Sequence, residues 1–254
     1  MEITYIGHSG FLIEWETCYW LFDYYKGDIP EMDSKKRIFV FASHNHKDHF
    51  NPEIFKLNDN YYNIEYVLSS DIKVTKEYCR KIGITDEIIN KIVSVKPSNE
   101  YELQDNGIVC NGGQLIDKNR IILKTLKSTD RGVAFLLHYQ EKTIYHAGDL
   151  NLWVWKEETK QNNNNMIAMF NKEMNVLKDI PIDIAFAPLD SRQEEWYYMG
   201  LEKLLNTAKV KYVFPMHFWK NQAVIQQFRQ ERMININNAK VMDICQEGQK
   251  WEIE

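Results

Sequence analysis

The amino-acid sequence predicts an α/β fold, in which short strands fill the first part of the chain and strands alternate with helices in the last third. Apolar runs of strand length are separated by short turns through the first quarter. The run 38–42 is apolar at every position, which is typical of a strand covered on both faces. From residue 166 onward, apolar residues recur at the spacing of a helix face.

The first half of the chain is predicted to be mostly strand. Strands are expected at 2–6, 10–15 and 18–23, where turn-like residues separate the apolar runs, and at 38–42. A helix is expected to begin at Asn51-Pro52, because Asn is a favoured cap and Pro fits the first helical position. The other elements expected here are a helix at 72–81 and strands at 64–69, 91–95, 107–110, 120–126, 132–138 and 143–147.

The last third is predicted to alternate between helices and strands. The expected elements are helices at 166–177, 197–208 and 221–233 and strands at 182–187, 210–215, 240–244 and 249–253. The run Asn162-Asn163-Asn164-Asn165 is interpreted as a solvated loop before the first of these helices. Because the sequence has no internal repeat and no linker rich in Pro, Gly or Ser, residues 1–254 are expected to form a single domain.

Composition disfavours several classes of protein. The formal net charge of −5 gives no excess of basic residues to neutralise a phosphate backbone, so no nucleic-acid partner is expected. No basic leader and no run of about 18 uncharged apolar residues is present, so neither secretion nor a membrane partner is expected. A cytoplasmic protein with reduced thiols is expected from four widely spaced cysteines, Cys18, Cys79, Cys110 and Cys245.

Four side chains that can bind metal lie within six residues, directly after the apolar run 38–42: His44, His46, Asp48 and His49. In an extended segment residues two apart point the same way, so His44 and His46 can grip one ion while Asp48 and His49 face a second. Imidazole and carboxylate are ligand types that zinc, iron and manganese accept. The alternative is a solvated loop that happens to hold three histidines, but the density of ligands favours a metal site.

The spacing His-x-His-x-Asp-His after a buried strand resembles the defining motif of the metallo-β-lactamase superfamily. Gly148-Asp149 after an apolar strand resembles the superfamily's bridging aspartate, and His217 resembles its last histidine. Gly7-His8-Ser9-Gly10 followed by Leu21-Phe22-Asp23 is similar to the branch that holds ascorbate-6-phosphate lactonase. The resemblance implies a four-layer αββα sandwich with mixed sheets and with metals in a cleft at one edge of the two sheets.

The same resemblance implies a ligand set and an activity. His44 and His46 would bind a first divalent ion, Asp48, His49 and His217 a second, and Asp149 would bridge them; one or two ions are expected, zinc foremost, with manganese or iron as alternatives. The protein would then hydrolyse a small molecule with a metal-bound hydroxide, which Asp48 would also orient. Redox members would carry Glu at the position of His46, and RNA-processing members carry a large inserted domain. A lactone, an ester or a phosphoester therefore remains as the substrate.

One position departs from the superfamily pattern. The superfamily normally supplies a further histidine to the first ion where this chain has Thr129. We hypothesise that the neighbouring Asp130 substitutes for it as a ligand or a hydrogen-bond partner, although a turn aspartate is equally often bonded to its own backbone. The departure also supports a rival function, that of a degenerate, non-catalytic protein that binds metal for sensing.

Several other residues are candidates for supporting roles. Asp23 could orient a ligand histidine or cap a turn, and His8 could face the site or bond its own turn. Arg192 follows a predicted strand and could hold an anionic substrate group, or form an exposed salt bridge. Tryptophans near the candidate ligands suggest an aromatic pocket wall, although tryptophan is more often core: Trp153, Trp155 and Trp219. His146 is expected to pack rather than to bind metal. The sequence makes no prediction of the oligomeric state.

Overall fold

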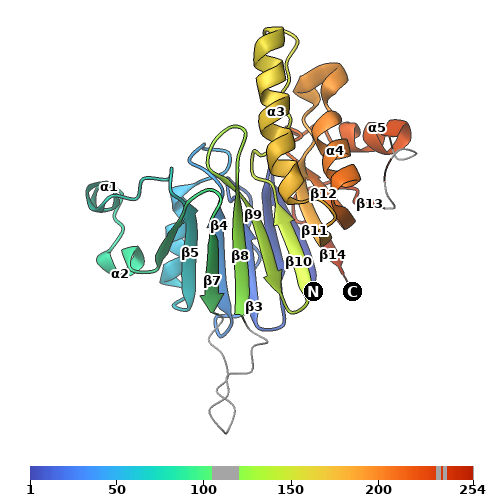
Figure 1. Ribbon diagram of the computed structural model, residues 1–254. Helices are drawn as coiled ribbons and strands as arrows, with labels where there is room; N and C mark the ends of the chain where they lie inside the picture. The colour runs from blue at the N-terminus through green and yellow to red at the C-terminus, as the bar shows by residue number, and fades with distance from the viewer. Residues whose placement is uncertain (105–119, 233–235, 237–238, 254) are drawn as a thin grey trace.

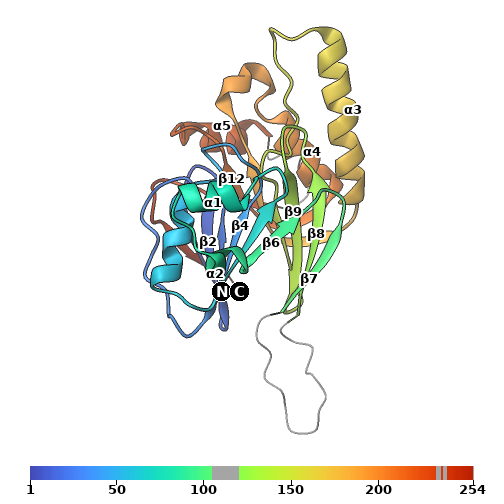
Figure 2. The same cartoon turned by 90° about the vertical axis from the view of Figure 1, so that its left-hand side faces the viewer.

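The computed structural model describes residues 1–104, 120–232, 236 and 239–253. Two seven-stranded sheets lie face to face, and helices cover the outer face of each (Figures 1 and 2). The expected four-layer αββα sandwich with mixed sheets is therefore confirmed. No helix in the described part of the chain is both long and apolar enough to cross a membrane.

The first sheet is built from the N-terminal strands and one strand from the end of the chain. Its spatial order is β14-β1-β2-β3-β4-β5-β6, antiparallel from β14 to β3 and parallel from β3 to β6. The strands are β1 (Glu2–Gly7), β2 (Gly10–Glu14), β3 (Cys18–Phe22), β4 (Arg37–Ala42), β5 (Ile64–Ser69), β6 (Ile92–Val95) and β14 (Lys250–Glu252). Because β14 pairs with β1, the two chain ends lie side by side (Figures 1 and 2).

The second sheet, like the first, has an antiparallel part and a parallel part. Its order is β13-β12-β11-β10-β9-β8-β7, antiparallel from β7 to β10 and parallel from β10 to β13. The strands are β7 (Glu100–Gln104), β8 (Arg120–Lys127), β9 (Val133–Tyr139), β10 (Lys142–His146), β11 (Pro181–Pro188), β12 (Lys209–Met216) and β13 (Lys240–Val241).

The position of strand β4 explains why residues 38–42 are all apolar. Phe39 and Phe41 point into the core between the two sheets, whereas Ile38, Val40 and Ala42 belong to a separate cluster under the helices of the first sheet. Successive strand residues alternate between faces, so a strand buried on both faces needs an apolar residue at every position. The strand is thereby fixed on both sides, and it holds the start of the histidine loop in place.

The helices divide between the two outer faces. Short helices cover the first sheet: η1 (Pro52–Asp59), α1 (Lys76–Lys81) and α2 (Asp86–Ile89). Longer helices pack on the second sheet: α3 (Lys160–Val176), α4 (Met199–Thr207) and α5 (Ala223–Arg232). The predicted cap at Asn51 is confirmed, since its side chain accepts a hydrogen bond from the Glu53 amide, although the helix that follows is a 3₁₀ helix.

Several predicted boundaries were wrong or incomplete. Helix α1 begins at Lys76 rather than at residue 72, because the Thr75 side chain caps it by accepting a bond from the Tyr78 amide. Strand β7 and helix α2 were not predicted; β7 is an edge strand whose charged residues hide its pattern. The expected strand 240–244 forms only over Lys240–Val241. The expected strand 107–110, Cys110 and the last residue of the expected helix 221–233 lie outside the described residues.

The interpretation of Asn162-Asn163-Asn164-Asn165 as a loop was wrong. These residues form the first turns of α3, which Thr159 caps by accepting a hydrogen bond from the Asn162 amide. The Asn163 side chain bonds both the amide and the carbonyl of Trp155, at 3.1 and 2.8 Å. The asparagine run therefore fastens the start of α3 to the segment that follows Asp149.

Candidate metal centre

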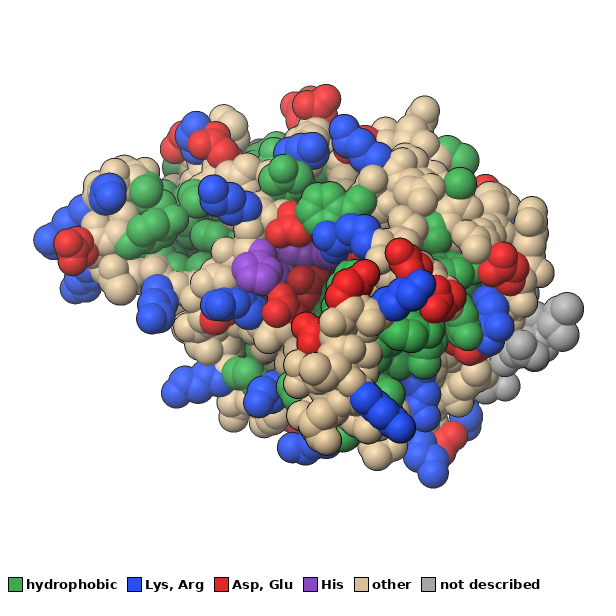
Figure 3. All heavy atoms as spheres, turned by 90° about the horizontal axis from the view of Figure 1, so that it is seen from above, with side chains coloured by type: hydrophobic (Ala, Val, Ile, Leu, Met, Phe, Trp, Pro, Cys, Tyr) green, Lys and Arg blue, Asp and Glu red, His purple; other side chains and the backbone are tan. Residues whose placement is uncertain are grey.

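The predicted ligand residues meet at one edge of the sandwich. The loop 44–49 follows β4, Asp149 follows β10, His217 follows β12, and Asp130 lies in the turn between β8 and β9. Histidines and carboxylates lie at the bottom of a hollow on this face, with apolar and basic side chains around its rim (Figure 3). The hollow is a pocket of about 490 Å³. Residues from both sheets thus contribute to a single site.

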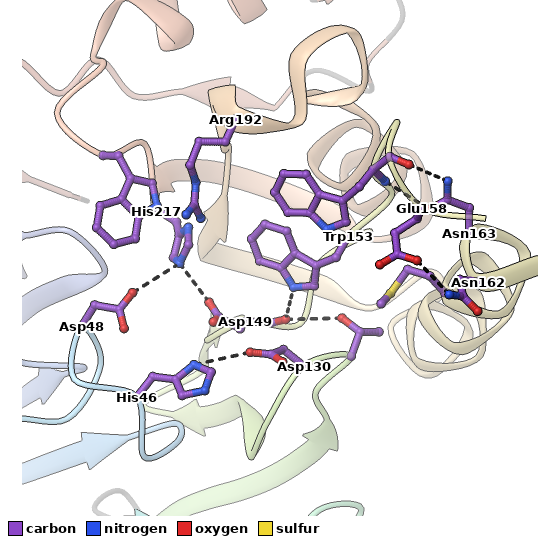
Figure 4. Close-up of a pocket in the computed structure, with 14 residues that line it drawn as sticks. His46, Asp48, Asp130, Asp149, Trp153, Glu158, Asn162, Asn163, Arg192 and His217 are labelled. Atoms are coloured by element: carbon purple, nitrogen blue, oxygen red, sulfur yellow. Dashed lines mark hydrogen bonds and ion pairs between the residues drawn. The ribbon is translucent and has the colours of Figure 1, made fainter. Parts of the chain in front are cut away.

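Asp149 lies at the middle of this arrangement. Its Oδ2 is 3.3 Å from His44 Nε2, and its Oδ1 is 3.2 Å from His49 Nε2. Its Oδ1 is also 3.4 Å from His217 Nε2 (Figure 4). The side chain is nearly buried. A carboxylate whose two oxygens face different sets of imidazoles is placed to bridge two ions.

The first cluster consists of His44, His46, Asp130 and Asp149, whose ligand atoms all lie within 4.8 Å of one another. His46 Nδ1 is 3.4 Å from Asp130 Oδ2 (Figure 4). Gly132 makes this approach possible: its φ is +67°, and a Cβ there would lie 2.0 Å from the Ser43 carbonyl oxygen. The turn from the second sheet therefore closes directly onto the histidine loop of the first.

Thr129, at the position of the absent histidine, has a structural role. Its hydroxyl donates to the carbonyl of Asn151 at 2.6 Å and accepts from the Asn151 amide at 3.1 Å. These bonds tie the β8–β9 turn to the segment that carries Asp149. The first cluster thus takes its fourth side chain from Asp130, one residue further along.

The second cluster consists of His8, Asp48, His49 and His217, whose ligand atoms also lie within 4.8 Å of one another. Asp48 Oδ2 is 3.3 Å from His8 Nε2, 3.8 Å from His217 Nε2 and 3.9 Å from His49 Nε2. Three ring nitrogens therefore surround a single carboxylate oxygen.

Buried carboxylates hold several of these rings from behind. Asp23 Oδ2 is 2.7 Å from His49 Nδ1 and accepts a 2.6 Å bond from the Ser43 hydroxyl. That hydroxyl is in turn 3.0 Å from His44 Nδ1, so one carboxylate orients a histidine of each cluster. Asp190, which sequence reasoning did not assign to the site, is 3.0 Å from His217 Nδ1. A carboxylate behind a ligand histidine fixes the ring so that the other nitrogen faces the metal.

The electrostatics of the cluster keep the carboxylates ionised. Burial alone would raise the pKa of Asp149, but the imidazoles of His49 and His217 hold that pKa well below its usual range. Burial alone would lower the pKa of His49, but Asp149 and Asp23 hold it well above its usual range. Burial alone would also raise the pKa of Asp190, but hydrogen bonds from the His217 and Arg192 side chains outweigh this effect and lower the pKa to about 2. The site is thus negatively charged and attracts cations.

The residues present fit divalent metal ions. Four buried atoms that face this centre have no hydrogen-bond partner within the described residues: His8 Nε2, His44 Nε2, His49 Nε2 and Asp149 Oδ1. Leaving a buried polar atom unpaired costs roughly 1–3 kcal/mol, so such atoms are rare unless something else binds them. Imidazole nitrogen and carboxylate oxygen are the ligands that zinc, manganese and iron share.

Aromatic and amide side chains form the rest of the pocket wall. Trp153 and Trp155 stack with parallel rings at a centroid separation of 6.1 Å, and Trp153 Nε1 donates to the Asp149 carbonyl at 2.9 Å (Figure 4). Trp219 also lines the pocket and is 44% exposed. Sequence reasoning missed the lining residues near the start of α3, because the asparagine run was interpreted as a loop: Glu158, Asn162, Asn163 and Met166.

Arg192 and His146 lie close to the centre but are engaged elsewhere. The Arg192 guanidinium bonds both oxygens of buried Asp190 and lies over the Trp219 ring, with its central carbon 4.7 Å from the ring centroid. His146 is fully buried, lies 3.0 Å from the Ser9 carbonyl through Nε2 and stacks on Phe22. Arg192 therefore supports His217 through Asp190, and His146 packs in the core beside the site, outside both clusters.

Comparison with known proteins gives matches over most of the chain. The family model of the Beta-lactamase superfamily domain matches residues 2–217. A metal-dependent hydrolase of Nanoarchaeum equitans (strain Kin4-M) is 27% identical over 230 residues, which cover 86% of this chain and 84% of that protein. Another, from Bacillus cereus (strain Q1), is 26% identical over 229 residues, which cover 86% of each chain. These relatives do not single out the ascorbate-6-phosphate lactonase branch.

A solved structure gives the same fold. Igni18, a metallo hydrolase from Ignicoccus hospitalis KIN4/I, superposes with a TM-score of 0.63 at 16% sequence identity, covering 100% of this chain and 99% of that one. At this level of identity the likeness concerns the arrangement of the strands and helices alone.

Proposed function

The chain belongs to the β-lactamase superfamily domain family, and from this premise we propose that it is a metal-dependent hydrolase of a small molecule. The observation that carries the proposal is that two clusters of imidazoles and carboxylates lie side by side at one open pocket, with Asp149 of the first in contact with two histidines of the second. The relatives from Nanoarchaeum equitans and Bacillus cereus are both metal-dependent hydrolases.

The proposed ligand set divides between the two clusters. His44, His46 and Asp130 would hold the first ion and Asp48, His49 and His217 the second, while Asp149 lies within reach of both groups. Divalent ions bound here, with zinc as our first candidate, would lower the pKa of a water molecule far below its bulk value, to about 7, and would polarise the bond to be hydrolysed.

The chain's own residues supply orientation and shape. Asp23 and Asp190 fix the rings of His49 and His217, so that each Nε2 faces the pocket. Asp48 is 23% exposed and lines the pocket, where its carboxylate can accept a hydrogen bond from the attacking water and orient it. These contacts hold the reacting groups in place before the substrate binds.

The pocket favours a compact substrate with an apolar part. We propose a lactone, an ester or a phosphoester whose apolar portion lies along Trp153 and Trp155, while the bond to be cleaved lies over Asp149. The anionic partner that we expected for Arg192 is supplied within the protein by Asp190, so we assign Arg192 a supporting role near the rim. A rival function as a non-catalytic metal sensor rested on Thr129, and the position of Asp130 beside His46 supports the hydrolase over that rival.

Turnover by metal-reconstituted protein tests the proposal. Protein stripped with a chelator is assayed on chromogenic lactones, esters and phosphodiesters with zinc, manganese or iron added back. We expect hydrolysis of at least one class that needs metal, is lost in His46→Ala and is kept in His138→Ala, which alters an exposed histidine outside both clusters. Tight metal binding with no turnover of any class would instead favour the sensor.

A further inference from the structure

We propose that His8 is a further ligand of the second metal site, in addition to Asp48, His49 and His217. This inference rests on the metal centre proposed above. His8 lies in the turn between β1 and β2, far in sequence from the histidine loop. Its Nε2 is nonetheless 3.3 Å from Asp48 Oδ2, within the 4.8 Å group that also contains His49 and His217.

The Nε2 atom of His8 is buried and unpartnered, like the Nε2 atoms of one proposed ligand histidine in each cluster. The His8 side chain is 6% exposed, and its Nε2 makes no hydrogen bond within the described part of the chain. The Nε2 atoms of His44 and His49 are also buried and unpartnered. The separation of 3.3 Å between His8 and Asp48 exceeds the usual 2.7–3.2 Å of such a hydrogen bond. It fits two ligands that approach the same ion.

His146, a buried histidine outside both clusters, differs from His8 in the hydrogen bonding of its Nε2 atom. His146 is only three residues away from Asp149 in the sequence. Its Nε2, however, is 3.0 Å from the Ser9 carbonyl oxygen and so has a hydrogen-bond partner. His8 has no such partner for Nε2, and that nitrogen faces the carboxylate of Asp48 instead. The two buried rings are therefore distinguished by where their Nε2 atoms point.

The backbone holds His8 and His217 together. Both adopt left-handed conformations that are rare for residues other than glycine, with φ of +54° and +64°. The His217 amide lies 3.4 Å from the His8 carbonyl oxygen and donates to it, and the two ring centroids are 4.4 Å apart. Strained conformations persist where the surrounding structure enforces them, and they concentrate at functional sites. Two loops from different sheets thus direct their imidazoles to the same point beside Asp48.

Nuclear magnetic resonance can test directly whether His8 binds the metal. The histidines are labelled with nitrogen-15, and the protein is loaded with cadmium-113 ions. A ring nitrogen bonded to the metal shows one-bond coupling to cadmium, whereas a ring held by a hydrogen bond or by packing does not. We expect five coupled imidazoles in the unaltered protein, those of His8, His44, His46, His49 and His217. The count is made on the unaltered protein, so it stands even where a variant folds poorly.

Two variants assign the signal and measure its effect. His8→Gln should lose one coupled resonance and weaken binding of the second ion by about tenfold or more. His138→Gln, which removes an exposed imidazole beside Thr143, should change neither. Coupling at four imidazoles, with none assigned to His8, would overturn this inference and leave the metal centre standing. Coupling at no imidazole would overturn the metal centre and this inference together.

Discussion

The two clusters of the metal centre differ in how firmly the fold holds them. In the first cluster, the side chains of His46 and Asp130 are 40% and 43% exposed. In the second, His49 and His217 are almost fully buried, and each has a buried carboxylate behind its ring. Rigid, supported ligands lose less freedom when an ion binds, so we expect the second cluster to bind metal more tightly and the first to exchange its ion more readily.

Removing the carboxylate of Asp149, which contacts histidines of both clusters, should have the largest effect. Asp149→Asn takes away the charge that faces His44 on one side and His49 on the other. We expect the hydrolysis rate to fall on the order of 10³-fold, because a catalytic ion contributes several kcal/mol and each ~1.4 kcal/mol is a factor of ten. Metal content after dialysis and the rate on the preferred substrate measure this. Asp183→Asn, a half-buried aspartate on β11, is the control and should leave both unchanged.

Substitution of the carboxylates behind the ligand histidines should affect the metal affinities of the two clusters differently. Among the proposed ligands, Asp190 contacts His217 of the second cluster, whereas Asp23 contacts His49 directly and His44 through the Ser43 hydroxyl. We expect Asp190→Asn to weaken the second ion by about 10–100-fold and leave the first unchanged, and Asp23→Asn to weaken both. Competition with a chromogenic chelator resolves the two affinities. Equal effects of the two variants on the first ion would show that the clusters are not supported as the contacts indicate.

Substitution of Asp130 should affect metal binding by the first cluster alone. Asp130→Ala removes the carboxylate 3.4 Å from His46, and we expect the first ion to bind about tenfold less tightly while the second is unaffected. Asp28→Ala, which alters an exposed aspartate away from the pocket, serves as the control in the same titration. Unchanged stoichiometry and affinity in Asp130→Ala would mean that Asp130 is only a turn residue, and that His44, His46 and Asp149 complete the cluster without it.

The smallest effect is expected at the pocket wall, beyond both clusters. Trp155→Leu removes one of two stacked rings, and we expect KM to rise about 2- to 10-fold with kcat unchanged, as a lost aromatic contact of ~0.5–1.5 kcal/mol predicts. Steady-state kinetics on a substrate with an aromatic group measures this. Trp251→Leu, on the distant edge strand β14, should not alter KM. A large fall in kcat for Trp155→Leu would place this ring in the reacting geometry.

Sequence reasoning found the part of the centre that is local in the chain. The ligands of the loop 44–49 stand together, so their spacing alone indicates a metal site. Asp130 was proposed only because the resemblance expects a histidine at the neighbouring position, where this chain has Thr129. The remaining ligand assignments, Asp149 and His217, depended on resemblance, because nothing in their own surroundings distinguishes them.

Contacts that depend on strand pairing escaped sequence reasoning. Asp190 and His217 are 27 residues apart, and they meet because parallel β11 and β12 pair with Pro188 opposite Met216. Each residue follows the end of its strand, but only the register places their side chains side by side. The start of α3 was missed for a different reason: composition suggested a loop, whereas Thr159 and the Asn163 side chain supply bonds that begin a helix there.

During synthesis on the ribosome, β1 emerges first, but its outer edge stays unpaired until residues 250–252 follow. An open strand edge is a template for pairing with another chain. His217 also emerges late, so the nascent chain carries the loop 44–49 well before the imidazole that lies across from it. We therefore expect chains that terminate before β14 to associate with one another through this free edge, rather than to fold into a slightly shorter version of the protein.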